Sequence, residues 1–122
     1  LFIRSFFIGQ NVNDLKRFDK EACGTDILKK LLYWQHIAPT VPDTIDGFPL
    51  KSRDPLIIDR VFPHIFFAGN QSCLKHSVVE FENGCKTLLL LVPKFSATFS
   101  VALVNLKTLE VTEQFFNSEK VG

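Results

Sequence analysis

The sequence predicts an α/β or α+β domain, with helices near its start and mostly β-strands after residue 60. Apolar residues at positions 27, 28, 31 and 32 follow the 3.6-residue period of a helix. The later segments are short, rich in β-branched and aromatic residues, and separated by turn residues. The length of 122 residues and the apolar fraction of 46% agree with one globular domain or part of one.

The first segment combines a predicted strand with a predicted short helix. Leu1–Ile8 is apolar enough for a strand buried on both faces, and Gly9 closes it. Asn11 or Asn13 is expected to cap a helix that runs through Arg17. The chain thus begins in the middle of an apparent strand, and we interpret it as a fragment of a longer protein.

A second helix is predicted to begin at Thr25 or Asp26, because either side chain can cap the first turn. One apolar face identifies it: Ile27, Leu28, Leu31 and Leu32. The helix should end before Pro39, since the residue before a proline is pushed out of the α region. A long irregular surface connection is then expected over Ala38–Pro55, which is rich in proline.

The second half is predicted to be nearly all β. Val61–Ala68 should form a strand with Pro63 near its start. Two hairpins are expected to follow, formed by Ser77–Phe81 with Lys86–Val92 and by Thr98–Val104 with Leu109–Phe115. Asn83 and Gly84 favour a type I′ turn in the first hairpin, because both residues tolerate positive φ. The end after Asn117 is polar and expected to fray.

Charge and cysteine content exclude several classes of protein. The 14 basic and 13 acidic residues give a net charge of +1, which leaves no broad basic surface for DNA or an anionic membrane. No apolar run approaches the roughly 18 residues that cross a bilayer. Cys23, Cys73 and Cys85 lack the spacing of a disulfide framework or zinc cluster, so a reducing compartment, cytosolic or nuclear, is expected.

Candidate acid–base or metal residues gather around the long connection: His36, Asp43, Asp46, Asp59 and His64. A two-metal phosphoesterase needs several such ligands converging on metals about 3.5 to 4 Å apart. The sequence contains no H-x-H or D-x-H pair. We therefore interpret His36 and His64 as structural histidines held by hydrogen bonds.

Other chemical motifs have simple structural interpretations. Cys73 as a nucleophile would need a base, and His76 is a weak candidate. The Asn70–Ser72 triplet matches a glycosylation pattern, which matters only in a secreted protein. Three aromatic residues could stack on bases, but no basic residues are interleaved with them, so core packing is expected: Phe62, Phe66 and Phe67.

Several runs follow one another along most of the chain: Gly9–Leu15 (GQNVNDL), His36–Asp43 (HIAPTVPD), Asp54 and Pro55, Pro63–Gln71 (PHIFFAGNQ), Val92–Thr98 (VPKFSAT) and Ala102–Leu109 (ALVNLKTL). Together these runs resemble the B-type accessory subunits of replicative DNA polymerases, and among them the small subunits of DNA polymerase delta. Their order over most of the chain carries the resemblance, because independent local signals agree. Ser5–Ile8, Cys73 and Lys75 depart from the delta-subunit pattern and leave details of partner contacts open.

This resemblance implies a calcineurin-like phosphoesterase fold, a two-sheet sandwich, of which residues 1–122 would be the C-terminal half. The N-terminal half and an oligonucleotide-binding-type barrel would precede it. Active archaeal relatives carry a Gly-His-x-His motif where this chain has Gly69, Asn70, Gln71 and Ser72. An amide and a hydroxyl are poor replacements for imidazole ligands, so the resemblance implies a lost metal site, with His36 as its one remnant.

The function that the resemblance implies is a non-catalytic scaffold with no cofactor. It would bind the C-terminal region of the polymerase catalytic subunit and a further accessory subunit, in DNA replication and repair in the nucleus. DNA would be bound only indirectly, through the complex. Four residues are candidate interface anchors: Phe48, Arg53, Phe99 and Phe115. The alternatives are an active metallophosphoesterase or 3′-5′ exonuclease, and an unrelated β-rich binding module.

Overall fold

The computed structural model describes residues 3–6, 9–47, 50–54, 56–58, 62–82 and 84–116, the first of these ranges by its backbone alone. Its elements follow one another as β1, α1, α2, β2, β3, β4, α3, β5 and β6. Within these residues no helix is both long enough and apolar enough to cross a membrane. Helices near the start and strands after them confirm the mixed α and β class.

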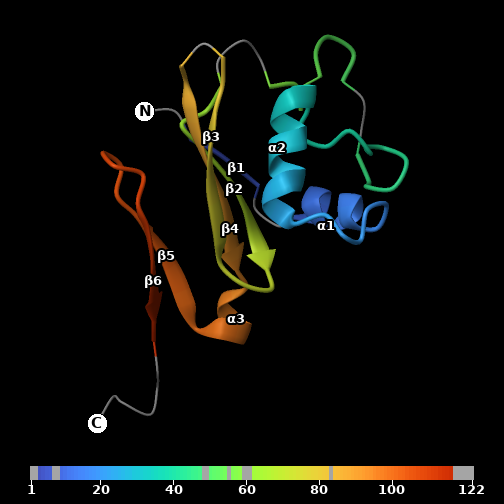
Figure 1. The fold of residues 1–122 in the computed structure, drawn as a ribbon. Coiled ribbons are helices and arrows are strands. Elements are labelled where there is room, and N and C mark those ends of the chain that lie inside the picture. The colour runs from blue at the N-terminus through green and yellow to red at the C-terminus, as the bar shows by residue number, and fades with distance from the viewer. Residues whose placement is uncertain are drawn as a thin grey trace.

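A four-stranded sheet forms the centre of the molecule (Figure 1). Its strands, in spatial order, are β1 (Ile3–Phe6), β2 (Ile65–Gln71), β4 (Lys86–Pro93) and β3 (Lys75–Glu80). β1, β2 and β4 run parallel, and β3 pairs antiparallel with β4. A parallel pair needs a crossover connection, and the helices supply it between β1 and β2.

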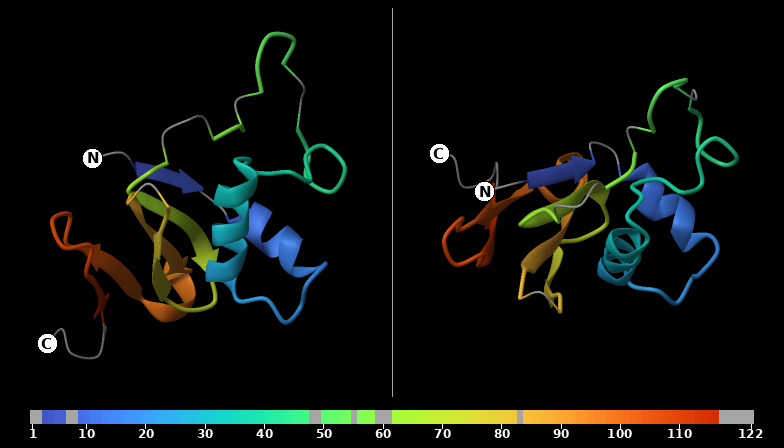
Figure 2. Two further views of the ribbon diagram at one scale, coloured as in Figure 1. Left: turned by 45° about the horizontal axis from the view of Figure 1, so that its top comes forward. Right: turned by 90° about the horizontal axis from the view of Figure 1, so that it is seen from above.

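Two helices cover one face of this sheet, α1 (Gln10–Lys16) and α2 (Gly24–Trp34) (Figures 1 and 2). The predicted apolar face of α2 is confirmed, because all four of its residues are buried. They share one core cluster with strand residues: Ile27, Leu28, Leu31, Leu32, Phe66, Ala68, Leu89 and Leu91. Burial of these side chains is the main force that holds the helices to the sheet.

The predicted helix caps are wrong for both helices. Gly9 and Cys23 occupy the N-cap positions, and neither makes a side-chain cap hydrogen bond. Asn11 is instead buried inside the first turn, where its amide Nδ2 donates to the carbonyl of Ile37 at 2.9 Å. Local preference predicted that the Asn11 side chain would cap the helix, but it instead makes this long-range hydrogen bond to Ile37. Thr25 and Asp26 likewise lie inside α2.

The end of α2 before Pro39 is confirmed. The helix ends at Trp34, and Gln35 follows in the left-handed region with a φ of 54°. Beyond it, the described residues between 38 and 54 contain turns but no helix or strand, as expected. Figures 1 and 2 show this connection projecting from the body of the molecule.

The strand expected at Val61–Ala68 lies further along the chain. β2 begins at Ile65 and continues through Gly69 to Gln71, whereas Val61 lies outside the described residues. Pro63 comes just before the strand and is buried, and its carbonyl accepts a hydrogen bond from Thr87 Oγ1 at 2.7 Å. Proline cannot donate to the ladder, which is why the pairing starts after it.

The first predicted hairpin is confirmed, but its predicted turn type is wrong. The N–H of Gly84 donates to the carbonyl of Phe81 at 2.9 Å, so a four-residue turn spans 81 to 84. Gly84 then takes a φ of 82° outside the centre of that turn. This arrangement is a three-residue loop with a left-handed glycine, and a two-residue type I′ turn would need Gly84 at its centre. Asn83 itself lies outside the described residues.

The second predicted hairpin is also confirmed, with a later start. Its strands are β5 (Ser100–Val104) and β6 (Val111–Phe115), which pair antiparallel as a separate two-stranded sheet. Thr98, which was expected in the first strand, belongs to the short helix α3 (Phe95–Thr98). The hairpin and the two longer helices lie on opposite sides of the four-stranded sheet (Figures 1 and 2).

Candidate functional site

The carboxyl ends of the parallel strands meet at one edge of the four-stranded sheet. Ligands of open α/β sheets bind at this edge. Gly69, Asn70 and Gln71 form the last part of β2 here and Ser72 follows it, and the pairing of β2 with β4 shifts between Ala68 and Gln71. The carbonyl of Gln71 accepts the N–H of Lys94 at 2.8 Å, which ties the ends of both strands together.

Asn70 adopts a backbone conformation that most residues avoid. Its φ is 58°, and its side chain is exposed at the edge of the sheet. Asparagine tolerates the left-handed region better than other residues with a Cβ atom. The neighbouring Gln71 side chain is buried and donates from Nε2 to the carbonyl of Gly69 at 3.0 Å. At this shift in the pairing of β2, the side-chain amide of Asn70 is therefore exposed, whereas that of Gln71 is buried.

Gly9, which comes after β1 in the chain, lies close to Gly69 and Gln71 of β2. A Cβ atom at Gly9 would lie 2.3 Å from the carbonyl oxygen of Gly69 and 2.4 Å from Gln71 Nε2, and the φ of Gly9 is 67°. Only glycine satisfies both the close approach and the positive φ. Gly9 was predicted only to end a strand, and this contact was missed because residues 9 and 69 are far apart along the chain.

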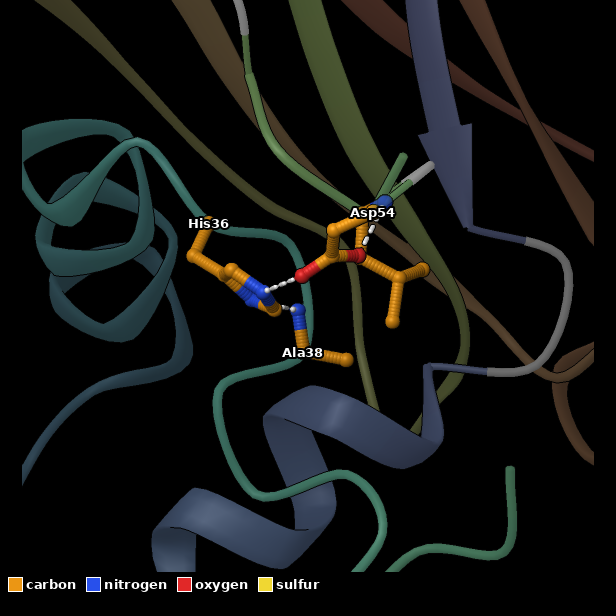
Figure 3. A network of polar contacts seen from close by, with 4 residues as sticks. His36, Ala38 and Asp54 are labelled. Atoms are coloured by element: carbon orange, nitrogen blue, oxygen red, sulfur yellow. Dashed lines mark hydrogen bonds and ion pairs between the residues drawn. The ribbon is translucent and has the colours of Figure 1, made fainter. Parts of the chain in front are cut away.

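His36 lies just beyond the end of α2 and faces the far end of the long connection (Figure 3). Its backbone forms an isolated antiparallel bridge with Ile57. Two backbone hydrogen bonds flank this bridge, Ile37 N–H to Leu56 O at 2.8 Å and Ile58 N–H to Gln35 O at 2.8 Å. The two ends of the projecting connection are thus joined at its base.

Both ring nitrogens of His36 are engaged (Figure 3). The backbone N–H of Ala38 donates to Nδ1 at 3.2 Å, so the neutral ring carries its hydrogen on Nε2. Nε2 then donates to Asp54 Oδ2 at 2.9 Å. The hydrogen bonds expected for His36 are thus present, whereas its structural role stays a prediction. In this arrangement neither nitrogen has a free lone pair for a metal ion.

Asp54 completes the pair from the other side of the connection. Its second oxygen, Oδ1, accepts the N–H of Leu56 at 2.9 Å. The hydrogen bond from His36 and then that from Leu56 hold the pKa of Asp54 below its usual value. Hydrogen bonds to the ionised form have this effect, so the carboxylate is charged at neutral pH. His36 and Asp54 lie at the two ends of the same long connection, but no other feature of the sequence predicted that they would pair.

The residues predicted to remain from a lost metal site fall into two separate groups, with His36 in one and Gly69, Asn70 and Ser72 in the other. Among the described residues, no hydrogen bond or ion pair links His36 to the stretch from Gly69 to Ser72. Within the same part of the chain, no three His, Cys, Asp or Glu side chains lie together as a metal site would require. Asp43, Asp46 and His64 are exposed, and Asp59 lies outside the described residues.

The cysteines show one contact that was not expected from the sequence. Cys23 Sγ lies 3.4 Å from Thr25 Oγ1 and 3.9 Å from Lys75 Nζ. The hydroxyl of Thr25 is the main cause that lowers the pKa of the Cys23 thiol. Cys73 and His76 are both exposed, and Cys73 Sγ has the hydroxyl of Ser72 within 4.0 Å.

A polar cluster around the buried carboxylate of Asp14 joins α1 to the start of the long connection. The carboxylate of Asp14 is buried, accepts the Thr44 hydroxyl at 2.5 Å and pairs with Arg17 at 3.2 Å. The hydroxyls of Thr40 and Thr44, in that order, hold the pKa of Asp14 below its usual value. Thr40 Oγ1 is buried without a partner of good hydrogen-bond geometry among the described residues, so its effect is that of a nearby dipole.

The candidate anchors and aromatic residues divide between core and surface. Phe66 is fully buried, as expected for core packing, and Phe62 stacks on Phe81 at 4.5 Å between ring centroids. Phe99 and Phe115 are more than half exposed. Arg53 is exposed as well, and Phe48 lies outside the described residues.

Comparison with known proteins gives a consistent family assignment. Residues 5–76 match the profile of the family of DNA polymerase alpha/epsilon B subunits. Over 111 residues the chain is 37% identical to a Caenorhabditis elegans protein named probable DNA polymerase delta small subunit, covering 91% of this chain and 24% of that relative. Over 111 residues it is 33% identical to the Arabidopsis thaliana DNA polymerase delta small subunit, covering 91% and 25%.

A third relative agrees with these two. Over 102 residues the chain is 42% identical to DNA polymerase delta subunit 2 of Drosophila melanogaster, covering 84% of this chain and 23% of the relative. The chain therefore spans about a quarter of the length of these curated relatives.

Proposed function

The chain belongs to the family of DNA polymerase alpha/epsilon B subunits, and from this membership we propose that it is part of a non-catalytic accessory subunit of a DNA polymerase delta complex. The observation that carries the proposal is the similarity over most of the chain to proteins named as delta small subunits. Family membership contradicts the alternative of an unrelated β-rich binding module.

The proposed role is that of a scaffold. The subunit binds the C-terminal region of the catalytic subunit and a further accessory subunit, acts in DNA replication and repair in the nucleus, and meets DNA only through the complex. The net charge of +1 supports indirect contact with DNA, because a groove that neutralises phosphates needs an excess of Lys and Arg. Residues 1–122 are proposed to be the C-terminal part of an inactivated calcineurin-like phosphoesterase domain.

Loss of catalysis is proposed from the chemistry of the site residues. Asn70 and Ser72 offer an amide and a hydroxyl, and neither replaces an imidazole as a ligand for a catalytic divalent metal. Both nitrogens of His36 are used within the chain, by Ala38 and Asp54. The residues that the active relatives use for metal binding thus have structural roles or neutral side chains here.

The experiment is co-expression of the full-length polypeptide that contains this chain, called here the parent polypeptide, with the C-terminal region of a delta catalytic subunit. We expect a stoichiometric complex on size-exclusion chromatography and no manganese-dependent phosphodiesterase activity. The outcome that overturns the proposal is metal-dependent hydrolysis lost in a variant with Asn70→Ala and Ser72→Ala. Ser77→Ala, a change on the exposed strand β3, serves as the matched control.

A further inference from the structure

β3 lies at one end of the four-stranded sheet and leaves one of its two edges open. Within the described part of the chain β3 pairs only with β4, in a register that runs without a bulge from Lys75 opposite Leu91 to Glu80 opposite Lys86. Bulges and prolines commonly keep an edge strand from pairing with another strand, and β3 contains neither. The open edge is therefore able to accept a further strand.

The hydrogen bonds between β3 and β4 determine which backbone groups face the open edge. The N–H of Phe81 donates to the carbonyl of Cys85 at 2.8 Å, and in an antiparallel pair every second residue bonds to the partner strand. The N–H of Leu88 agrees with this alternation, because it donates on the β2 side, to the carbonyl of His64 at 2.8 Å. The residues of β3 whose backbone groups face the open edge are His76, Val78 and Glu80.

The same three residues present their side chains on one face of the sheet. Side chains alternate between the two faces along a strand, and Val79 packs in the core cluster that includes α2. Val78 therefore lies on the face away from the helices, where it is 51% exposed. His76 and Glu80 are also exposed, two residues to either side of Val78. The edge thus carries an imidazole, an apolar side chain and a carboxylate in that order.

This order is complementary to itself. A twofold axis through Val78, perpendicular to the sheet, sets Val78 opposite Val78 of a second copy and sets His76 opposite Glu80 twice. The residues that meet in this register have their backbone groups at the open edge, as hydrogen-bonded pairs require. An imidazole N–H can donate to a carboxylate, and opposite charges directly across two strands are stabilising, whereas like charges are destabilising. The edge therefore fits a second copy of itself.

The helix layer leaves room for such pairing. α2 runs along β3, because Cys23 contacts Lys75 near one end of the strand and Tyr33 contacts Phe81 near the other. α2 also contacts β4, so it lies over the two outermost strands and not over the open edge. With strands about 4.8 Å apart, the α2 axes of two copies would be about 10 Å apart. Packed helices have axes about 8–10 Å apart, so the two helices can pack without overlap.

The second sheet of the proposed phosphoesterase domain would not occupy this edge. The two sheets of a sandwich pack face to face, so the second sheet covers a face of the first. An edge is completed by the addition of a strand, to which main-chain hydrogen bonds supply affinity. The self-complementary order of His76, Val78 and Glu80 favours a second β3 over an unrelated strand.

We infer that two copies of the parent polypeptide associate through antiparallel pairing of their β3 strands, centred on Val78. The two four-stranded sheets then form one continuous sheet. A single pair of short strands is a small interface, so the association is weak and depends on concentration. This inference goes beyond the proposed function, which concerns binding to other kinds of subunit.

The first test is sedimentation equilibrium of the purified parent polypeptide, without other subunits, at about 1–100 µM, where weak contacts form. We expect the average mass to rise from that of a monomer towards that of a dimer. Val78→Pro removes an N–H that faces the open edge but no hydrogen bond to β4, and it should weaken the dimer at least about ten-fold. Val78→Thr is the matched control, because it keeps the N–H and the branched side chain.

Charge exchange across the axis gives the second test. His76→Glu places two carboxylates opposite each other, and Glu80→Lys places a lysine opposite His76, so each should weaken the dimer about ten-fold. The variant with both substitutions again has opposite charges at both positions and should regain the dimer. Rescue by the second substitution excludes misfolding of β3 as the cause, also if Val78→Pro fails to fold in thermal unfolding.

Three results would overturn the inference. The first is a parent polypeptide that stays monomeric over the whole concentration range. The second is a dimer that a folded Val78→Pro variant leaves unchanged, and the third is a double charge variant that does not regain the dimer. A monomer in which Val78→Pro weakens only the complex with the catalytic-subunit region would assign the edge to that partner. Complex formation is measured separately, so failure of the proposed function would be recognised independently.

Discussion

The helix-covered part of the molecule and the β5–β6 hairpin differ in how completely they bury their apolar residues. In the first part, α2 and the central strands share a cluster in which Leu28, Phe66 and Leu89 are almost fully buried. In the hairpin, Leu103 and Phe115 stay more than half exposed. A core can close within a short chain when helices lie next to the strands they cover, whereas a two-stranded sheet has no such local cover.

The largest difference between the two parts should be seen on truncation of one leucine in each. We expect Leu28→Ala to lower the free energy of unfolding by about 2–5 kcal/mol, because it leaves a cavity in a packed core. Leu103→Ala should change it by less than about 0.5 kcal/mol, because more than half of this residue is exposed to solvent. Urea unfolding followed by circular dichroism measures both. Equal effects would contradict the contrast between the two parts.

A comparison of alanine substitutions at Gly9 and Gly84 tests how much the close contact between Gly9 and Gly69 constrains the end of β2. Gly9→Ala should cost roughly 2–4 kcal/mol, because a Cβ atom combines left-handed backbone strain with a clash against the Gly69 carbonyl. Gly84→Ala is the matched control, since its φ is also positive but nothing lies within 4 Å of the added atom. It should cost only the strain, about 1–2 kcal/mol. Thermal unfolding of the two variants would show whether the extra loss at Gly9 exists.

The buried carboxylate of Asp14 should make the attachment of the long connection depend on pH. Its pKa is lowered in the folded state, so its stabilising contribution is complete above the ordinary carboxyl pKa, about 4, and is lost as the pH falls through the folded-state value. Thr44→Val removes a hydrogen bond to this charge and should cost about 1–3 kcal/mol at pH 7.

Urea unfolding at several pH values tests this expectation. The difference between Thr44→Val and the unchanged chain should shrink below about pH 4, because the carboxyl group is then increasingly protonated in both. A difference that stays constant from pH 7 to pH 3 would mean that the Thr44 hydroxyl acts independently of the Asp14 charge.

The smallest effect is expected at the His36–Asp54 pair, which is partly exposed. Asp54→Asn should leave the global stability nearly unchanged, since exposed pairs contribute little. It should increase the rate of proteolytic cleavage within residues 39–53, because the base of the connection is held less firmly. Limited proteolysis with Asp43→Asn, a change at an exposed residue of the same connection, provides the comparison.

For the candidate site, residue chemistry was predictable and spatial grouping was not. Hydrogen bonding of His36 was expected from its place after a helix, and the structure shows its partners, Ala38 and Asp54. The contact of Gly9 with Gly69 was not expected, because it joins positions sixty residues apart in the sequence. The charge-assisted cluster around Asp14 was missed for the same reason, since Thr44 lies thirty residues away.

Local sequence patterns were enough to predict the helix α2, both hairpins and the order of helices before strands. These features rest on periodicity and turn residues, which act over a few positions of the chain. The caps of the helices, the start of β2 after Pro63 and the pairing of His36 with Asp54 became known only from the folded structure. Each of these depends on a hydrogen-bond partner or packing neighbour brought close by folding, and such partners override local preference because they satisfy buried polar groups.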